Sequence, residues 1–407
     1  MEVNNSTLNN CACGRWDFTD EDETFLLQHG WWVQNFTSGL VGILGLFVNI
    51  IGIVVLSDRK MKKVFFNQLL ICLAVFDIVF LICCLNDSFR RHIVRRCDHE
   101  EHQKYLLLVF YPARQIAMFG SIYMTMIIAY ERYTALATLF SNETSTFGFS
   151  GKRRALKIVS MVVLGSFVYN FPWFLAFGIK QERILHNSTY PFKEEILENT
   201  TSSPLNAIKN CFAPTDFRSS KDFVLWYVNV ANFVVTGVIP FLCLVVFNWK
   251  IITKIRHLSK ERNILDIIGT VSSSNGNQRK NQKVQEGRRA VIMFVIVIAF
   301  LFLHSLRSIL NIEEIWSYEE REKTMETAKH IGKMCRGDQF WYVMATVYSH
   351  LLLVLNSSIN FFVYCLFGKQ FRDIMKEKMR YVTKLFRSCK KDGKDKQNVT
   401  EMPVVKP

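Results

Sequence analysis

One carboxylate lies near the middle of a long apolar run that carries no other charge, Val64 to Asn86. Polar groups are costly inside a membrane, so Asp77 is a candidate functional residue that needs partners. Candidate partners in other apolar runs are Asn49, Ser121, Asn356, Ser357 and Asn360. A carboxylate among hydroxyl and amide oxygens suits a hard cation, here Na+ as an allosteric ion, and no cofactor is required. A protonated Asp77, hydrogen-bonded to the same groups, is an equal alternative.

A Glu-Arg pair ends a second apolar run, Tyr105 to Tyr130. In the tripeptide Glu131-Arg132-Tyr133, the Arg can pair with its neighbour or be released to another partner, and these are the two states of a switch. An ordinary ion pair at the membrane interface explains the tripeptide equally well. A further arginine, Arg114, lies eighteen residues before Arg132, and therefore five helical turns away on the same face.

Seven apolar runs hold these residues, and each is long enough to cross a bilayer, which takes roughly 20 residues of helix. Helices buried in a soluble protein would show a polar stripe, which these runs mostly lack. The sequence therefore predicts an all-α membrane protein, a seven-transmembrane helix bundle formed by residues 32–366. The predicted spans are 32–57, 64–86, 105–136, 156–179, 222–255, 286–315 and 339–366.

The net charge of +15 is concentrated on one side of this bundle. Lys and Arg cluster after the first span, before the fourth, between the fifth and sixth, and after the seventh, a side that the positive-inside rule assigns to the cytoplasm. The distribution favours membrane lipids rather than nucleic acid as the partner of the basic surface. We expect a multi-pass protein of the plasma membrane, with an acidic N-terminal tail outside (residues 1–31) and a C-terminal tail in the cytoplasm (residues 388–407).

Two segments on the cytoplasmic side have distinct compositions. Residues 367–387 place apolar side chains at near-helical spacing among Lys and Arg, which predicts a short amphipathic helix on the inner membrane surface. Thr270 to Gln282 is rich in Ser, Asn and Gln and is expected to lack regular structure. The absence of an internal repeat weighs against a transporter, and no catalytic group accompanies Asp77, so we expect no enzyme.

Candidate modification sites fit the same topology. Four sequons lie on the outer side: Asn4, Asn5, Asn187 and Asn199. Cys97 and Cys211 precede the third and fifth spans, in an oxidising compartment where a disulfide would persist. The pairing stays open, because the same side also holds Cys11, Cys13 and Cys335. Cys389 follows the seventh span and is either a palmitoylation site or a plain thiol.

Several motifs occur together across five spans. They are Asn49; Asn67 with Leu73-Ala74-Val75-Phe76-Asp77; Glu131-Arg132-Tyr133; Pro240; and Asn360-Phe361-Phe362-Val363-Tyr364 followed by Phe371. The set resembles the rhodopsin-like (class A) family of G-protein-coupled receptors over nearly the whole chain. A narrower resemblance, to invertebrate FMRFamide-type neuropeptide receptors, rests on Tyr111-Pro112, Gly120 to Thr125, Tyr169 to Pro172, Pro214 to Arg218, Asn356 to Asn360 and Tyr364 to Gly368.

The resemblance implies an extracellular peptide ligand, an amidated neuropeptide, and a heterotrimeric G protein that docks at the inner ends of the spans; arrestin is a further inner partner. It places the ligand cavity at Arg114, Gln115, Met118, His304, Arg307 and Glu314. It places the coupling switch at Glu131, Arg132, Tyr133, Asn360 and Tyr364. Alternatives are a non-signalling or scavenging receptor, a receptor for a non-peptide anionic ligand and, least favoured, a transporter or channel.

Arg114 bears on the ligand class. Amine receptors of this family carry Asp at the position of Arg114, so an amine ligand is disfavoured. The guanidinium could instead bind a ligand carboxylate or an amide carbonyl, or it could pair internally with Glu313 or Glu314.

The chain departs from the family pattern at several positions. Phe361 replaces the proline of the seventh span, and Asn248 replaces the tyrosine that partners the arginine from the fifth. The sixth span has no proline and carries His304 near the usual kink. A proline kink lets the inner half of that span swing outward, so its absence leaves the detail of the movement open.

Overall fold

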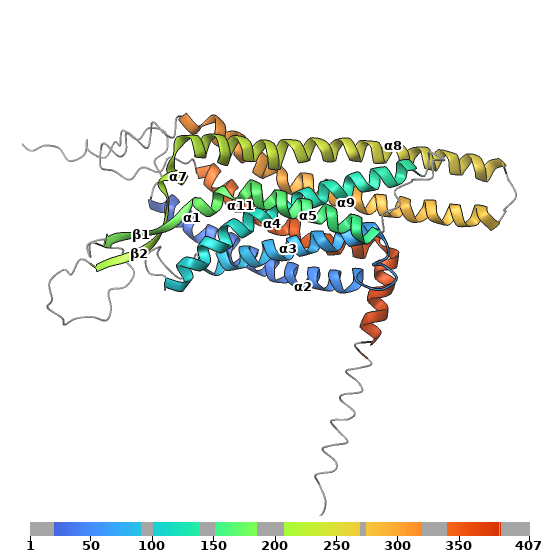
Figure 1. The fold of residues 1–407 in the computed structure, drawn as a ribbon, viewed down its shortest axis with the longest axis horizontal. Coiled ribbons are helices and arrows are strands. Elements are labelled where there is room, and N and C mark those ends of the chain that lie inside the picture. The colour runs from blue at the N-terminus through green and yellow to red at the C-terminus, as the bar shows by residue number, and fades with distance from the viewer. Residues whose placement is uncertain are drawn as a thin grey trace, which may run out of the picture.

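Seven long helical segments cross the bundle side by side, one for each predicted apolar run (Figure 1). The computed structural model describes residues 20–90, 101–138, 151–184, 207–268, 274–319, 340–381 and 383. Within these ranges, six segments are long and apolar enough to cross a membrane, and α4 is the seventh. The predicted seven-helix bundle is therefore confirmed.

The crossings are built from the following elements. The first comprises α1 (Asp20–Gly30), the π-helix η2 (Trp31–Thr37) and α2 (Ser38–Leu56). The next three are α3 (Phe65–Arg90), α4 (Glu101–Thr138) and α5 (Gly151–Asn170), which the short α6 (Pro172–Leu175) extends. The fifth comprises η3 (Phe223–Ala231), η4 (Phe233–Val238) and α8 (Ile239–Ile268). The last two are α9 (Ser274–Trp316) and α11 (Phe340–Phe367).

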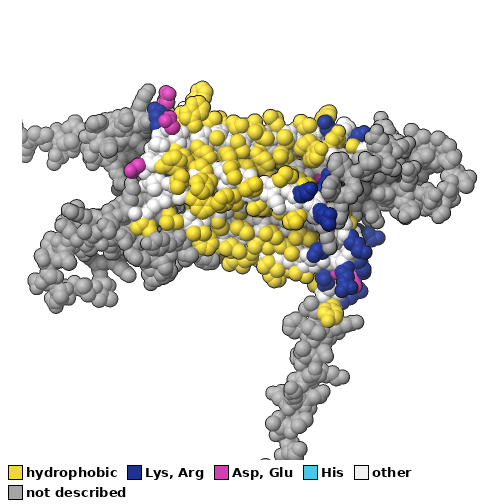
Figure 2. Space-filling view, viewed as in Figure 1, with side chains coloured by type: hydrophobic (Ala, Val, Ile, Leu, Met, Phe, Trp, Pro, Cys, Tyr) yellow, Lys and Arg dark blue, Asp and Glu magenta, His cyan; other side chains and the backbone are white. Residues whose placement is uncertain are grey.

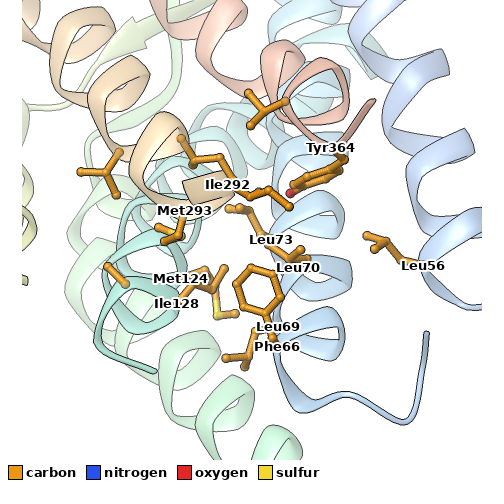
Figure 3. Close-up of a cluster of buried hydrophobic side chains, with 14 of the residues drawn as sticks. Leu56, Phe66, Leu69, Leu70, Leu73, Met124, Ile128, Ile292, Met293 and Tyr364 are labelled. Carbon is orange, nitrogen blue, oxygen red and sulfur yellow. The ribbon is translucent and has the colours of Figure 1, made fainter. Parts of the chain in front are cut away.

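The core takes buried side chains from all seven crossings. α4 packs against α3, α5, α8 and α9, and α11 packs against α2, α3 and α9. Buried apolar side chains such as Leu73 of α3, Met124 of α4 and Met293 of α9 point toward one another in the centre (Figure 3). Further large apolar side chains cover the outside of the bundle as a broad belt (Figure 2). Such an exposed belt suits hydrocarbon rather than water.

Two glycines lie where helices approach most closely. A Cβ on Gly45 of α2 would lie 2.8 Å from the Cβ of Ser358 on α11, and one on Gly120 of α4 would lie 2.7 Å from Cζ of Phe76 on α3. Small residues let helix backbones come close in a membrane, where packing and hydrogen bonds hold helices together. These contacts fix the spacing of α2, α3, α4 and α11 around Asp77.

Gly45→Ala is expected to destabilise the bundle by about 1–3 kcal/mol, because the added methyl would overpack the contact with Ser358. Gly39→Ala is the matched control, since a Cβ at Gly39 of the same helix meets no atom within 4 Å. Thermal unfolding of the detergent-solubilised variants measures the difference. Equal midpoints for the two variants would contradict the close packing of α2 against α11.

The end of the predicted outer tail is helical. α1 begins with four acidic residues, Asp20 to Glu23, which the positive end of the helix dipole favours. Phe25 stacks on Phe340 with ring centroids 6.1 Å apart, and His29 Nε2 lies 2.9 Å from the Tyr348 hydroxyl oxygen. The acidic tail predicted for residues 1–31 therefore ends in a helix, α1, which these aromatic contacts dock on α11.

The outer loop after the fourth span forms a hairpin. β1 (Phe177–Ile184) pairs antiparallel with β2 (Ala207–Pro214), and α7 (Asp216–Ser219) follows. α5 ends just before Pro172, which lacks a backbone N–H and cannot continue the helical ladder. The fourth crossing thus ends at Leu175, before the predicted boundary at residue 179, and the hairpin is a small addition to the helical bundle in which the outer segments satisfy their backbone groups as paired strands.

The inner end also differs from expectation in one place. α9 begins at Ser274, so most of the segment expected to lack regular structure is helical, and α8 and α9 project together beyond the bundle (Figure 1). After α11, residues 369–381 form a helix that turns away from the bundle axis (Figure 1). Phe371 and Ile374 of this terminal helix are buried against the core, whereas Met379 is 61% exposed. Its contact with the membrane surface stays a prediction.

Candidate ligand cavity and switch residues

An outer cavity of about 60 Å3 lies between η2, α2, α3, α4, α9 and α11. Its volume is several times the space that one water molecule needs. Four of the six predicted ligand residues line it: Arg114, Gln115, Met118 and Arg307. The sequence did not identify four further polar residues of its wall: Gln34, Ser38, Asp87 and His350.

Arg114 forms an ion pair at the wall of this cavity. Its Nη1 donates to Asp87 Oδ2 at 3.1 Å, and its Cζ lies 5.2 Å from the centroid of the Tyr111 ring. The two charged side chains are 15% and 20% exposed, so they are largely removed from solvent but reach the cavity. The expected internal partner, Glu313 or Glu314, is therefore wrong, because α3 rather than α9 supplies the carboxylate.

Two predicted ligand residues lie away from the outer cavity. Glu314 accepts a hydrogen bond from Tyr342 Oη at 3.3 Å, near the outer end of α9. His304 lies deeper, and its ring stacks on Phe300 with centroids 4.1 Å apart. In this structure neither residue belongs to the wall that carries Arg114.

Asp77 is fully buried and joins three helices. Ser121 Oγ of α4 donates to its Oδ1 at 2.7 Å, and Asn360 Nδ2 of α11 donates to its Oδ2 at 2.8 Å. Asn49 of α2 donates to the backbone carbonyl of Ser357 at 2.8 Å, which attaches a fourth helix to the same layer. The network thus connects the faces of α2, α3, α4 and α11.

A small cavity of about 10 Å3 adjoins this network, with Ser121, Asn356, Ser357 and His304 in its wall. Its volume is close to the space that one water molecule needs. Hydroxyl and amide oxygens beside a carboxylate are the ligands that Na+ accepts, so the residues present fit such an ion next to Asp77. Phe80, Met118 and Leu353 line this cavity and the outer one, so the two share a wall.

Arg132 is held in place at the inner end of α4. Its Nε donates to Glu131 Oε2 at 2.6 Å and its Nη2 donates to Glu131 Oε1 at 2.7 Å. Its Cζ lies 4.2 Å from the ring centroid of Phe66 on α3, and the residue is 3% exposed. Two charge-assisted bonds and an aromatic face hold the side chain in this position, and its release to another partner stays a prediction.

The fifth crossing adds an unpaired polar group beside this switch. Asn248 is 5% exposed, and neither atom of its amide has a hydrogen-bond partner among the described residues. Leu244, one turn before it, belongs to the core cluster that contains Ile128 of α4, and Ile251, one turn after it, is fully buried. A buried unsatisfied amide is costly, so the Asn248 side chain is a polar group of the core whose partner is still to be identified.

Tyr133 and Tyr364 complete the predicted switch. The Tyr133 ring lies 6.4 Å from that of Phe247, and Lys250 Nζ lies 5.1 Å from its centroid. Tyr364 is 4% exposed, and its hydroxyl end points toward Ile292 (Figure 3). It borders an inner cavity of about 320 Å3, and the first turn of the terminal helix lines the same cavity.

Ion pairs attach the terminal helix to the turn between α2 and α3. Lys60 Nζ lies 3.4 Å from Glu377, and Lys378 Nζ lies 3.5 Å from Asp58. The backbone N–H of Lys60 donates to Asp58 at 3.0 Å and, together with Lys378, lowers the pKa of that carboxyl below its usual value. Such exposed pairs contribute little stability, but they attach the helix whose first turn lines the inner cavity.

Several predicted sites lie outside the described residues: Cys97, Asn4, Asn5, Asn187, Asn199 and Cys389. Cys211 lies in β2, opposite Lys180 of β1. The Cys97–Cys211 disulfide, the glycosylation sites and the palmitoylation site stay predictions.

Comparisons with known proteins agree with this architecture. The family model described as the serpentine type 7TM GPCR chemoreceptor Srw matches residues 35–381. The FMRFamide receptor of Drosophila melanogaster is 27% identical over 350 residues, which are 84% of this chain and 53% of that receptor. The FMRFamide peptide receptor frpr-18 of Caenorhabditis elegans is 20% identical over 343 residues, which are 83% of this chain and 66% of that receptor.

The chain thus spans between about half and two thirds of the length of these curated relatives. The matched family region contains the Asp77 network, the outer cavity wall from α3 to α11, and the Glu131–Arg132 pair. The chain therefore belongs to the serpentine 7TM GPCR chemoreceptor Srw family.

Proposed function

We propose that this chain is a class A G-protein-coupled receptor that binds an extracellular peptide, an amidated neuropeptide of the FMRFamide type, and activates a heterotrimeric G protein. Both relatives described above are named FMRFamide receptors. The observation that carries the proposal is that one helix serves both sites. α4 presents Arg114 to the outer cavity and Arg132, about 27 Å further along the helix, to the inner end.

A ligand can shift such a protein only by binding one of its states more tightly than the other. In the resting state, Glu131 and Phe66 hold Arg132. A peptide that contacts Arg114 and Asp87 acts on the contact between α3 and α4. The active state then releases Arg132 toward the G-protein α subunit, and Asn248 supplies a new polar neighbour from α8.

The charge distribution supports an orientation with the N-terminus outside. Lys and Arg gather at one end of the bundle (Figure 2), and this end includes the α2–α3 turn, the start of α5 and the terminal helix. The positive-inside rule places that end in the cytoplasm, against anionic lipids of the plasma membrane. The G protein, and arrestin after it, would use this inner end.

Glu131→Gln is expected to raise ligand-independent signalling several-fold, because it removes the charge that holds Arg132 in the bidentate pair. Basal cyclic AMP or calcium signal, divided by surface abundance, is the measurement. Asp58→Asn is the control, since it neutralises a carboxylate at the same end of the bundle that pairs with Lys378. An unchanged basal signal in Glu131→Gln would argue that the pair is only structural.

The proposed function is tested by expressing the chain in cultured cells and applying a library of amidated neuropeptides, with calcium and cyclic AMP as readouts. A saturable, dose-dependent response in cells with verified surface receptor supports it. Silence across the library at verified surface abundance would contradict it and favour a non-signalling or scavenging receptor. A response to small non-peptide anions alone would replace the peptide with another ligand class.

A further inference from the structure

The outer cavity contains an ion pair where a ligand head group would arrive. Arg114 and Asp87 lie 3.1 Å apart, each largely buried and each part of the cavity wall. The ring of Tyr111, 5.2 Å from the guanidinium carbon, supports the arginine. Arg307 of α9 lines the same cavity and adds a second positive charge.

This pair distinguishes a free carboxylate from a primary carboxamide, whereas an arginine alone would accept either group. A free carboxylate that approached Arg114 would also approach the carboxylate of Asp87, and like charges placed side by side in a partly desolvated site repel strongly. A primary carboxamide carries no charge. Its carbonyl accepts from a guanidinium, which has five N–H donors, and its NH2 group donates to a carboxylate.

We infer that the Asp87–Arg114 pair reads the C-terminal carboxamide of the peptide and rejects the corresponding free acid. The inference rests on the proposed function and deepens it by naming the chemical group and the two side chains that select it. The amide carbonyl binds Arg114, the amide N–H binds Asp87, and the ion pair persists beside the inserted group. A cavity of about 60 Å3 admits such a head group while the rest of the peptide extends outward.

The negative charge of Asp87 offsets the positive charge of Arg114 in the cavity wall. Without this carboxylate, Arg114 and Arg307 would make the wall strongly cationic and would favour a free acid. With it, the position at Arg114 is electrically neutral and offers a matched donor and acceptor. Asp87 is therefore a specificity-determining residue, and its neutralisation changes which peptide terminus is preferred rather than only how tightly peptides bind.

The test uses each active peptide in two forms, the C-terminal amide and the free acid, beginning with FMRFamide and its acid. We expect the amide to be at least about tenfold more potent on the unmodified receptor. In Asp87→Asn this potency ratio should fall by about tenfold or reverse, chiefly because the acid gains potency. Glu21→Gln, which neutralises an exposed carboxylate of α1 on the same outer side, is the control and should keep the ratio.

A second variant covers the case in which Asp87→Asn fails to reach the cell surface. The double variant Asp87→Asn/Arg114→Gln replaces the ion pair with two amides that can still bond each other, and it should likewise lose the discrimination. An unmodified receptor that responds to the acid as strongly as to the amide would overturn the inference, as would a ratio unchanged in both variants. Silence of the surface-exposed receptor toward both forms of every peptide would instead overturn the proposed function, and the inference with it.

Discussion

Arg132→Ala is expected to abolish peptide-induced signalling, with a loss of roughly 100-fold or more in response at matched surface abundance. Arg132 is the charged side chain that α4 keeps buried at the inner end, where it bonds Glu131 and faces Phe66. Once released, its five donors are the group that can engage a G-protein α subunit. Alanine removes the held state and the released state together.

Peptide binding should survive this change. Arg132 lies about 27 Å from Arg114 along α4, and it does not line the outer cavity. Labelled peptide should therefore bind Arg132→Ala cells in amounts similar to unmodified cells. Arg132→Lys should recover only part of the signal, since a lysine ammonium keeps the charge but cannot form the planar two-bond pair with Glu131.

Arg154→Ala provides a matched control. Arg154 lies at the inner end of α5 with its Cζ 5.0 Å from the Phe65 ring, so it faces an aromatic ring as Arg132 does, but it is only partly buried. Its loss should leave the maximal response within about twofold, as expected for a surface substitution. A full response in Arg132→Ala, or an equal loss in Arg154→Ala, would show that Arg132 has no special part in coupling.

The depth of each polar residue in the membrane could be predicted from the sequence, because an apolar run of fixed rise per residue acts as a ruler. Asp77, Ser121 and Asn360 meet in the structure since buried polar groups in a membrane have few partners to choose from. The seven crossings followed from the same reasoning. The rotation of each helix about its own axis could not be predicted from the sequence. This rotation decides which of several polar residues at the same depth come into contact.

The partner of Arg114 shows the consequence. Glu313, Glu314 and Asp87 all lie near the outer ends of their helices, and only packing selects Asp87. The sequence did contain one indication that Arg114 pairs with Asp87. If Asp77 bonds Ser121, then Asp87 lies about 15 Å outward on α3 and Arg114 about 10 Å outward on α4, a separation that a long arginine side chain spans.

Docking of α1 could not be predicted for a related reason. Phe25 and His29 are isolated features in an acidic segment, and their partners Phe340 and Tyr348 lie more than 300 residues later in the chain. The same holds for Gln34, Ser38 and His350, which border the outer cavity only because α2 and α11 pack together. Such residues carry no local signal of burial or charge pairing.

Asp77→Ala is expected to reduce the amount of folded receptor by roughly tenfold or more. The change leaves the Ser121 hydroxyl and the Asn360 amide without their acceptor in the centre of the bundle. Each unsatisfied buried donor costs about 1–3 kcal/mol, so the sum is a large part of the stability of a typical domain. Surface abundance and thermal unfolding of the solubilised receptor measure the effect, and normal values for both would contradict the central role of this network.

Asp77→Asn helps to distinguish the two states that the sequence left open for Asp77, an ionised carboxylate that binds Na+ and a protonated, hydrogen-bonded carboxyl group. The variant keeps the shape of the side chain and one acceptor, so we expect enough surface receptor for binding measurements. We propose that Na+ binds beside Asp77, with oxygens of Ser121, Asn356 and Ser357 at the small cavity completing the site. An ion there ties α3, α4 and α11 in the resting arrangement and so opposes the state that the peptide selects.

Peptide affinity of the unmodified receptor should therefore fall several-fold when NaCl replaces choline chloride at constant ionic strength, whereas the affinity of Asp77→Asn should not change. If Asp77 is instead protonated and hydrogen-bonded, sodium should have no effect on either receptor, and Asp77→Asn should bind peptide much as the unmodified chain does. The two outcomes differ in the unmodified receptor alone, so the sodium titration decides the matter even if Asp77→Asn reaches the surface poorly. A sodium effect that persists in a well-expressed Asp77→Asn would place the ion elsewhere in the bundle.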